Sequence, residues 1–198
     1  MRTLVVIPTY NERANIQALL NQVLSLPEGF HVLVVDDGSP DGTAQLVKEI
    51  QNQFPTRIHL LERAGKLGLG TAYLAGFRWG LNSGYDFIFE MDADFSHNPN
   101  DLSRLLHACL QEGADLAIGS RYVRGGGVIN WPFNRIALSK GASIYTRLIT
   151  GMPIKDPTAG FMCYSRKVLE ALNLDRIRFV GYAFQIEMKF KPGGLVLN

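Results

Sequence analysis

Short apolar runs alternate with longer stretches of helical periodicity along the first 120 residues of this chain. The runs are LVVI (4–7), VLVV (32–35), IHLL (58–61), FIF (87–89) and LAI (116–118). Each is rich in Val, Ile, Leu or Phe with almost no alternating polar position, which is typical of strands covered on both faces. We therefore expect these runs to be strands of a buried sheet.

The stretches between the runs carry apolar residues at helical spacing. The first such set, preceded by Asn11 as a candidate helix cap, is Ile16, Leu19, Leu20, Val23 and Leu24. Similar patterns occupy 43–53, 69–82 and 101–111, and residues 131–150 predict an amphipathic helix of about 15 residues. This alternation predicts a three-layer α/β/α fold, in which helices cover both faces of a mainly parallel central sheet.

Composition narrows the class of protein. With 198 residues, 46% apolar and 19% charged, the chain is an ordinary globular domain and not a disordered one. A net charge of +2 gives no general attraction to nucleic acid, so we expect no nucleic-acid partner. The two cysteines, Cys109 and Cys163, are far apart and lack metal-ligand spacing, which predicts buried, reduced thiols.

The chain shows no secretory signal and no run of the roughly 18 to 20 apolar residues that a membrane span requires. We therefore expect a cytoplasmic protein, either free or peripheral at a membrane.

Acidic residues follow three of the predicted strands. They lie in PTYNE (8–12), DDGS (36–39) and DAD (92–94), and they are Glu12, Asp36, Asp37, Asp92 and Asp94. Ligands bind beyond the carboxyl ends of parallel strands, so these acids should gather at one ligand-binding edge. For Asp36 alone, a role in a turn or helix cap is the alternative interpretation.

Asp92 and Asp94 are one residue apart after a buried strand. Because side chains alternate along extended backbone, both carboxylates should point to the same side. Two carboxylates so close repel each other unless a proton or a cation lies between them. Hard oxygen ligands suit Mg²⁺ or Mn²⁺, which keep positions open for phosphate oxygens. The pair therefore predicts a divalent cation on a diphosphate.

The segment between Asp115 and Asp156 contains basic residues and no acid. The basic residues are Arg121, Arg124, Arg135, Lys140, Arg147 and Lys155. Arg135 and Ser139 are four apart, so on a helix they share one face and could bind a phosphate together. A solvated basic face is the alternative interpretation, and attraction to anionic lipid would add to phosphate binding.

Eight motifs together resemble the family 2 glycosyltransferases of the GT-A fold, which is Rossmann-like. They are VVIPTYNERANI, VLVVDDGSPDGT, GKLGLGTAYLAGF, EMDADFSHNP, DLAIGSRYVRGG, NWPFNRIALSKGAS, DPTAGFMCYSRKVLEAL and GYAFQIEMKF, in order from residue 3 to about 191. Within that family the chain is most similar to dolichol-phosphate or polyprenol-phosphate mannose synthases. The resemblance implies transfer of mannose from GDP-mannose to polyprenol phosphate, with inversion and with Mg²⁺ or Mn²⁺ as cofactor.

The resemblance also implies roles for individual residues. Those that would bind the donor are Pro8, Tyr10, Glu12, Val35, Asp37, Asp92, Ala93, Asp94 and Arg121. Asp94 would be the principal metal ligand, with Asp92 and with Ser96, which stands where relatives often have Gln. Arg121, Arg135 and Ser139 would hold the acceptor phosphate, and with Asp94 they form the expected catalytic set.

A lipid phosphate is already anionic and nucleophilic near neutral pH, so the predicted reaction needs no general base. We therefore interpret Glu187, in FQIEM, as an orienting or structural residue rather than a base. Lys66, in GKLGLGT, is a further candidate for contact with the diphosphate. A lipid acceptor also implies peripheral contact with the cytoplasmic face of a membrane.

The end of the chain departs from the family pattern. Relatives continue past FQIEM with a basic motif over the donor diphosphate, whereas this chain reads KFKPGGLVLN. We therefore expect one catalytic domain over residues 1–191 and an atypical, shortened end over 192–198. Two alternatives stay open: a UDP-sugar donor carrying glucose or an aminosugar, and a nucleotide-binding module without turnover.

Overall fold

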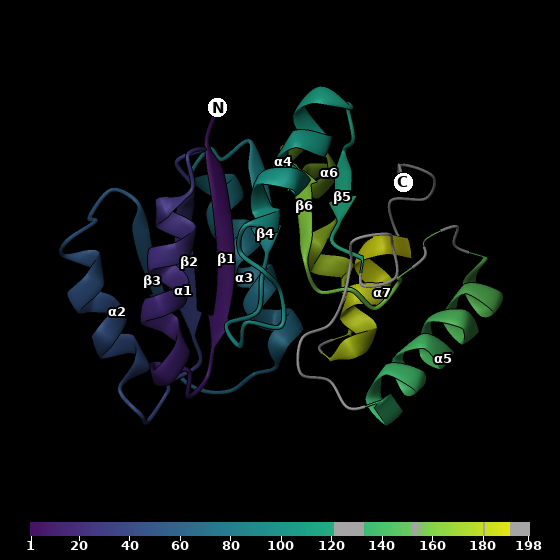
Figure 1. Ribbon diagram of the computed structural model, residues 1–198, viewed down its shortest axis with the longest axis horizontal. Helices are drawn as coiled ribbons and strands as arrows, with labels where there is room; N and C mark the ends of the chain where they lie inside the picture. The colour runs from purple at the N-terminus through teal and green to yellow at the C-terminus, as the bar shows by residue number, and fades with distance from the viewer. Residues whose placement is uncertain (121–132, 152–153, 155, 180, 191–198) are drawn as a thin grey trace.

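The computed structural model describes residues 1–120, 133–151, 154, 156–179 and 181–190, with the backbone alone at 133–140, 182 and 190. Six strands form one sheet in the order β3-β2-β1-β4-β6-β5 (Figure 1). They are β1 Thr3–Thr9, β2 His31–Asp36, β3 Ile58–Glu62, β4 Phe87–Glu90, β5 Leu116–Ile118 and β6 Met162–Ser165. The pairs among β1 to β4 are parallel, while β6 runs antiparallel to both of its neighbours.

Helices cover both faces of the sheet. One face packs against α1 (Arg13–Ser25), α2 (Thr43–Gln51) and α4 (Asp101–Gln111). The other packs against α3 (Leu69–Asn82), α6 (Arg166–Ala171) and α7 (Tyr182–Phe190), with a short 3-10 helix at Leu174–Arg176. Helix α5 (Phe133–Thr150) lies at the end of the molecule opposite β3 (Figure 1). The predicted three-layer α/β/α fold with a mainly parallel sheet is confirmed.

The apolar runs and helical patterns identify most of these elements. All five predicted strands are present, and α3 and α4 occupy the predicted residues. The predicted helix cap at Asn11 is wrong, because α1 begins at Arg13 with Glu12 in the cap position and Asn11 has a φ of +63°. Strand β6 was not predicted, since its four residues, MCYS, are too short and too mixed in polarity to stand out.

The order of the strands fixes where a ligand can bind. The chain builds β2 and β3 on one side of β1 and then returns to place β4 on its other side. The connection after β1 runs toward β2 and the one after β4 runs toward β5, so the two diverge along the sheet and open a crevice at its carboxyl edge. Asp92 and Asp94 come directly after β4, beside this crevice.

Cys109 and Cys163 are buried free thiols, with their sulfur atoms 3.5 Å apart, as predicted. Among the described residues, every helix is too short or too polar to cross a bilayer.

A histidine cluster lies at the opposite edge of the sheet from the crevice. The hydroxyl of Tyr85 is 2.9 Å from Nδ1 of His31 and 3.3 Å from Nε2 of His59. The guanidinium of Arg2 lies over the Tyr85 ring, 4.3 Å from its centroid. Burial lowers the pKa of both imidazoles below 6.5, and neighbouring positive charge, including Arg2, lowers it further. The folded protein therefore favours neutral histidines here.

This cluster predicts acid-sensitive stability. Both histidines bind protons less readily in the folded than in the unfolded chain, so their contribution is full above pH 6.5 and is lost as the pH falls below it. We expect the melting temperature to drop less over that interval in a His31→Gln, His59→Gln double variant than in the wild type. His107→Gln, at an exposed site on α4, is the control. Equal drops in all three proteins would contradict the prediction.

Candidate active site

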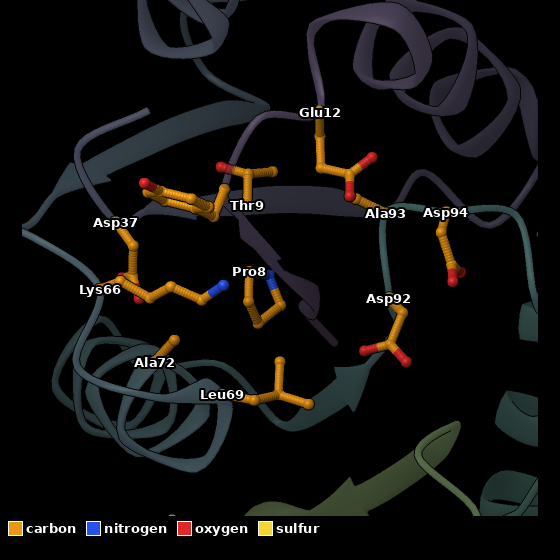
Figure 2. A pocket seen from close by; sticks show the side chains of 11 residues that line it. Pro8, Thr9, Glu12, Asp37, Lys66, Leu69, Ala72, Asp92, Ala93 and Asp94 are labelled. Carbon is orange, nitrogen blue, oxygen red and sulfur yellow. The ribbon is translucent and has the colours of Figure 1, made fainter. Parts of the chain in front are cut away.

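A pocket of about 230 Å³ opens in the crevice at the carboxyl edge of the sheet (Figure 2). Its lining comes from the end of β1, from the loops after β1, β2, β3 and β4, and from the start of α3. The residues are Pro8, Thr9, Tyr10, Glu12, Asp37, Lys66, Leu69, Ala72, Asp92, Ala93 and Asp94. Figure 2 shows Glu12, Asp92 and Asp94 on one side of the pocket and Asp37 with Lys66 on the other.

The loop after β1 is held in place by the loop after β2 and by the first residue of α2. The backbone N–H of Asn11 donates to Oγ of Ser39 at 3.0 Å, and that of Glu12 donates to Oγ1 of Thr43 at 3.1 Å. The side chain of Glu12 accepts a hydrogen bond from Asn15 at 2.9 Å. These contacts keep the Tyr10 ring and the Glu12 carboxylate at the mouth of the pocket.

The two aspartates after β2 have different roles. Asp36 is buried and accepts hydrogen bonds from Thr9 Oγ1 at 2.8 Å and from the Ser39 hydroxyl at 2.6 Å. Asp36 therefore stabilises the turn after β2, which agrees with the alternative interpretation of this residue as a turn or cap residue. Asp37 lines the pocket and forms a bidentate ion pair with Arg63, at 2.6 and 2.7 Å.

Arg63 positions the segment that covers one side of the pocket. Besides Asp37, its guanidinium donates to Oγ1 of Thr71 at 2.9 Å, and that hydroxyl donates to the Gly68 carbonyl at 2.7 Å. The segment between them carries Lys66, whose ammonium lies 4.6 Å from the centroid of the Tyr10 ring. This arrangement offers a cation and an aromatic face within one pocket, which suits a nucleotide.

The carboxylates after β4 lie in a field of negative charge. Asp92 accepts a hydrogen bond from the Tyr73 hydroxyl at 2.8 Å, and Asp94 accepts one from the backbone N–H of Ser96 at 2.9 Å. Burial raises the pKa of Asp92 to about 6, and the charges of Asp94 and Glu12 contribute to the rise. In the described part of the chain neither aspartate has a salt-bridge partner. A bound cation would relieve this repulsion.

The donor set fits a divalent cation that a ligand helps to bind. Asp92 and Asp94 supply oxygen ligands, but the described residues contain no group of three or more His, Cys, Asp or Glu at ligand spacing. The remaining ligands would therefore come from water and from a bound phosphate group. Ser96 does not line the pocket, so its predicted metal contact stays a prediction.

The structure brings most predicted donor-binding residues together and leaves others apart. Val35 is completely buried in β2 and does not line the pocket, so its predicted contact with the donor also stays a prediction. Arg121 lies outside the described residues. Arg135 and Ser139 belong to α5, but their side chains lie outside the described part of the chain. The predicted acceptor site is therefore named from the sequence alone.

Sequence reasoning missed the residues behind the pocket. Arg63 could have been found, because it follows β3 at the same edge as Asp37 and has the opposite charge. Tyr73 could not have been found from the sequence, because nothing about a tyrosine on the apolar face of a helix indicates that its hydroxyl reaches Asp92. Glu90 lies just past the predicted run FIF and was given no role; it is completely buried, and burial raises its pKa to about 7.

Glu187 on α7 is already engaged by the backbone. Its Oε2 accepts hydrogen bonds from the N–H groups of Arg178 at 2.9 Å and Phe179 at 3.1 Å. Those contacts agree with the structural role expected for this residue.

Two known proteins are similar to this chain in sequence over almost its whole length. A polyprenol monophosphomannose synthase from Mycolicibacterium smegmatis is 53% identical over 190 residues, which are 96% of this chain and 71% of that protein. An undecaprenyl-phosphate mannosyltransferase from Micrococcus luteus is 46% identical over 195 residues, which are 98% of this chain and 79% of that protein.

Solved structures share the fold at lower identity. Glucosyl-3-phosphoglycerate synthase from Mycobacterium tuberculosis, in complex with UDP, superposes with a TM-score of 0.68 at 22% identity, over 98% of this chain and 67% of that one. A mannosyltransferase from Pyrobaculum calidifontis, in complex with GDP-Man and Mn²⁺, gives 0.59 at 18% identity, over 87% and 46%.

The sequence also matches the family described as glycosyl transferase family 2 over residues 4–172. That range runs from β1 through α6 and includes every residue that lines the pocket. The chain belongs to glycosyl transferase family 2.

Proposed function

We propose that this glycosyltransferase transfers a mannosyl group from GDP-mannose to the phosphate of a polyprenol lipid, with inversion at the anomeric carbon. The observation that carries the proposal is the 53% identity to a polyprenol monophosphomannose synthase over 96% of the chain. The pocket supports it, since an aromatic ring, a cation and an acidic group at one edge of the sheet suit a sugar nucleotide with its metal.

The chain's own residues bind the two ends of the donor differently. Tyr10 lines the pocket and would offer its ring to the base, and Asp37, held by Arg63, would lie at the side of the ribose. Lys66 reaches into the pocket, where its ammonium would contact the diphosphate (Figure 2). The sugar then lies beyond Asp92 and Asp94, at the open side of the crevice.

Asp92 and Asp94 would hold Mg²⁺ or Mn²⁺, with Asp94 as the more exposed ligand. When bound, the metal neutralises the charge that develops on the leaving diphosphate.

The acceptor needs alignment rather than activation. An ionised lipid phosphate already carries the attacking lone pair, so its oxygen displaces GDP directly from the anomeric carbon. We assign Glu187 no role as a base in this step. Its carboxylate accepts hydrogen bonds from the backbone N–H groups of Arg178 and Phe179. Arg121, Arg135 and Ser139 are proposed to orient the phosphate, on the basis of the sequence.

Helix α5 offers a surface for the lipid bilayer. Its exposed apolar residues form one stripe, which consists of Ile144, Tyr145, Leu148 and Ile149. Arg147, next to them in the sequence, is also exposed. A helix with apolar and basic residues on its outer side binds the interface of anionic membranes. We propose that α5 rests on the cytoplasmic face of the membrane and brings the acceptor phosphate to the pocket.

Donor identity is tested by calorimetric titration of GDP-mannose and UDP-glucose, each with Mn²⁺ and with a chelator, and then by transfer to polyprenol phosphate. We expect metal-dependent binding of GDP-mannose and a lipid-linked mannose product. Preference for UDP-glucose would favour the UDP-sugar alternative. Binding without product would favour a nucleotide-binding module, and absence of metal-dependent binding would contradict the assignment of Asp92 and Asp94.

The metal ligand is tested by Asp94→Asn, which keeps the shape of the side chain and removes its charge. We expect kcat/KM to fall about 10²- to 10³-fold, because the leaving diphosphate loses electrostatic stabilisation. The control is Asp175→Asn, at an exposed ion pair with Arg78 on another part of the surface. Full activity of the Asp94 variant would exclude a metal role for this residue.

The acceptor site is tested by Arg135→Ala with a short-chain polyprenol phosphate in detergent. Loss of a charge-assisted hydrogen bond predicts a KM for the acceptor that is roughly 10- to 100-fold higher, with unchanged affinity for GDP-mannose. Arg104→Ala, on the exposed side of α4, should leave both values unchanged. A weakened donor affinity instead would assign Arg135 to the donor site.

Membrane contact is tested by sedimentation with vesicles of phosphatidylcholine, with and without phosphatidylglycerol. We expect the wild type to bind the anionic vesicles. A Leu148→Asp, Ile149→Asp variant should bind them at least about tenfold more weakly, because two aliphatic side chains no longer enter the interface. Leu110→Asp, an exposed leucine on α4, is the control. Equal sedimentation of the three proteins would rule out α5 as the contact surface.

A further inference from the structure

Helix α7 carries two buried polar side chains that the proposed chemistry does not use. Gln185 is 4% exposed and Lys189 is 1% exposed. A buried lysine is rare, because removing its charge from water is costly unless hydrogen bonds compensate. The contacts of these two side chains therefore indicate what α7 holds in place.

Lys189 clamps the loop that precedes β6. Its ammonium donates to the carbonyl oxygen of Ala159 at 2.6 Å and to that of Pro157 at 3.0 Å. A third hydrogen bond, at 3.2 Å, goes to the carbonyl of Gln185 in its own helix. Lys189 thereby fixes the path of the loop up to Gly160, where an added Cβ would lie 3.7 Å from Oδ2 of Asp92. One side of the Asp92 carboxylate thus faces a loop that α7 holds.

Gln185 fixes the end of β4. Its Nε2 donates to Oε2 of Glu90 at 2.8 Å, and the other oxygen of Glu90 accepts from the Tyr164 hydroxyl at 2.9 Å. Glu90 is the last residue of β4 and stands two residues before Asp92. The backbone that carries Asp92 is therefore anchored to α7 and to β6 at once.

Phe184 supports the other side of the Asp92 carboxylate. Its ring stacks on the ring of Tyr73, with centroids 6.1 Å apart and planes 2° from parallel, and the Tyr73 hydroxyl donates to Oδ1 of Asp92. Phe184 also packs so closely on α3 that an added Cβ at Gly70 would come within 2.8 Å of its ring. Three side chains of one helix thus contact the end of β4, the loop before β6 and the tyrosine that donates to Asp92.

We propose that Gln185 and Lys189 are positioning residues of the donor site, which hold the end of β4 and the loop at 157–160 so that Asp92 faces the metal and diphosphate. The proposal rests on the proposed function in one respect, namely that Asp92 binds the donor through a metal. It adds to that site the side chains that hold Asp92 from behind, supplied by a helix that does not line the pocket.

A helix that only stabilises the fold would behave differently from one that positions Asp92. Loss of a purely structural contact lowers the melting temperature and leaves the affinity of the folded molecules unchanged. Loss of a positioning contact weakens metal and nucleotide binding by the folded protein, since partners behind a metal ligand typically contribute 10- to 100-fold in affinity. The two cases are therefore separable by measurements well below the melting temperature.

The experiment compares Gln185→Leu and Lys189→Met with two controls. Lys167→Met removes an exposed lysine that pairs with Asp115 at 3.1 Å, and Phe30→Leu weakens the apolar core on the opposite face of the sheet. Calorimetry measures the affinity for Mn²⁺ with GDP, and kinetics give KM for GDP-mannose and for the lipid separately. We expect both α7 variants to bind Mn²⁺ with GDP roughly 10- to 100-fold more weakly, with unchanged KM for the lipid.

The controls decide between the two interpretations. Lys167→Met should match the wild type, and Phe30→Leu should melt earlier with unchanged affinity. If the α7 variants behave like Phe30→Leu, the proposal is wrong. Should Lys189→Met fail to fold, Gln185→Leu and Phe184→Leu decide by the same criterion. A wild-type protein that binds no GDP in the presence of Mn²⁺ would overturn the proposed function itself, whereas normal wild-type binding with unaffected variants would overturn this inference alone.

Discussion

Repulsion between carboxylates beyond the end of β4 is the constraint around which the site is arranged. Asp92, Asp94 and Glu12 face one pocket, and burial together with mutual repulsion raises the pKa of Asp92 to about 6. Such an arrangement is stable only if neighbouring groups hold the carboxylates apart and a proton or a cation lies between them. Tyr73 and the backbone of Ser96 supply the first requirement through single hydrogen bonds. Under the proposed function, the donor with its metal would meet the second requirement, so that substrate binding would relieve the repulsion.

The two sides of the pocket differ in whether their carboxylates are neutralised by the protein itself. Asp37 is neutralised within the protein by Arg63, through two short hydrogen bonds in fixed geometry. That half needs no ligand to be stable and can be preorganised for the nucleoside that we propose it binds. The half at Asp92 and Asp94 lacks such a partner among the described residues. A nucleoside without its diphosphate should therefore gain little from the acidic side.

Periodicity in the sequence predicts which segments form helices and strands, but it does not give the neighbours in space. The runs at 4–7 and 87–89 could be assigned as strands, and the acids after them could be placed at one edge, because parallel strands end together. Nothing in MCYS shows that it inserts between β4 and β5. For the same reason Gln185 and Lys189 pass for ordinary helical residues, since their contacts join segments far apart in the chain. Local patterns thus predict the ligand-facing side of the site better than its support.

The antiparallel strand β6 has a consequence for how this protein can change. Ile118 at the end of β5 pairs with Met162 at the start of β6, and the N–H of Gly119 donates to the Phe161 carbonyl at 2.8 Å. The intervening chain, with α5, therefore leaves and re-enters the sheet at a single closed point. Doubling the length of such an excursion costs only about 0.6 kcal/mol in closure entropy. The segment that we propose contacts the acceptor can accordingly be lengthened, shortened or exchanged, with a change in acceptor choice, while the rest of the sheet keeps its structure.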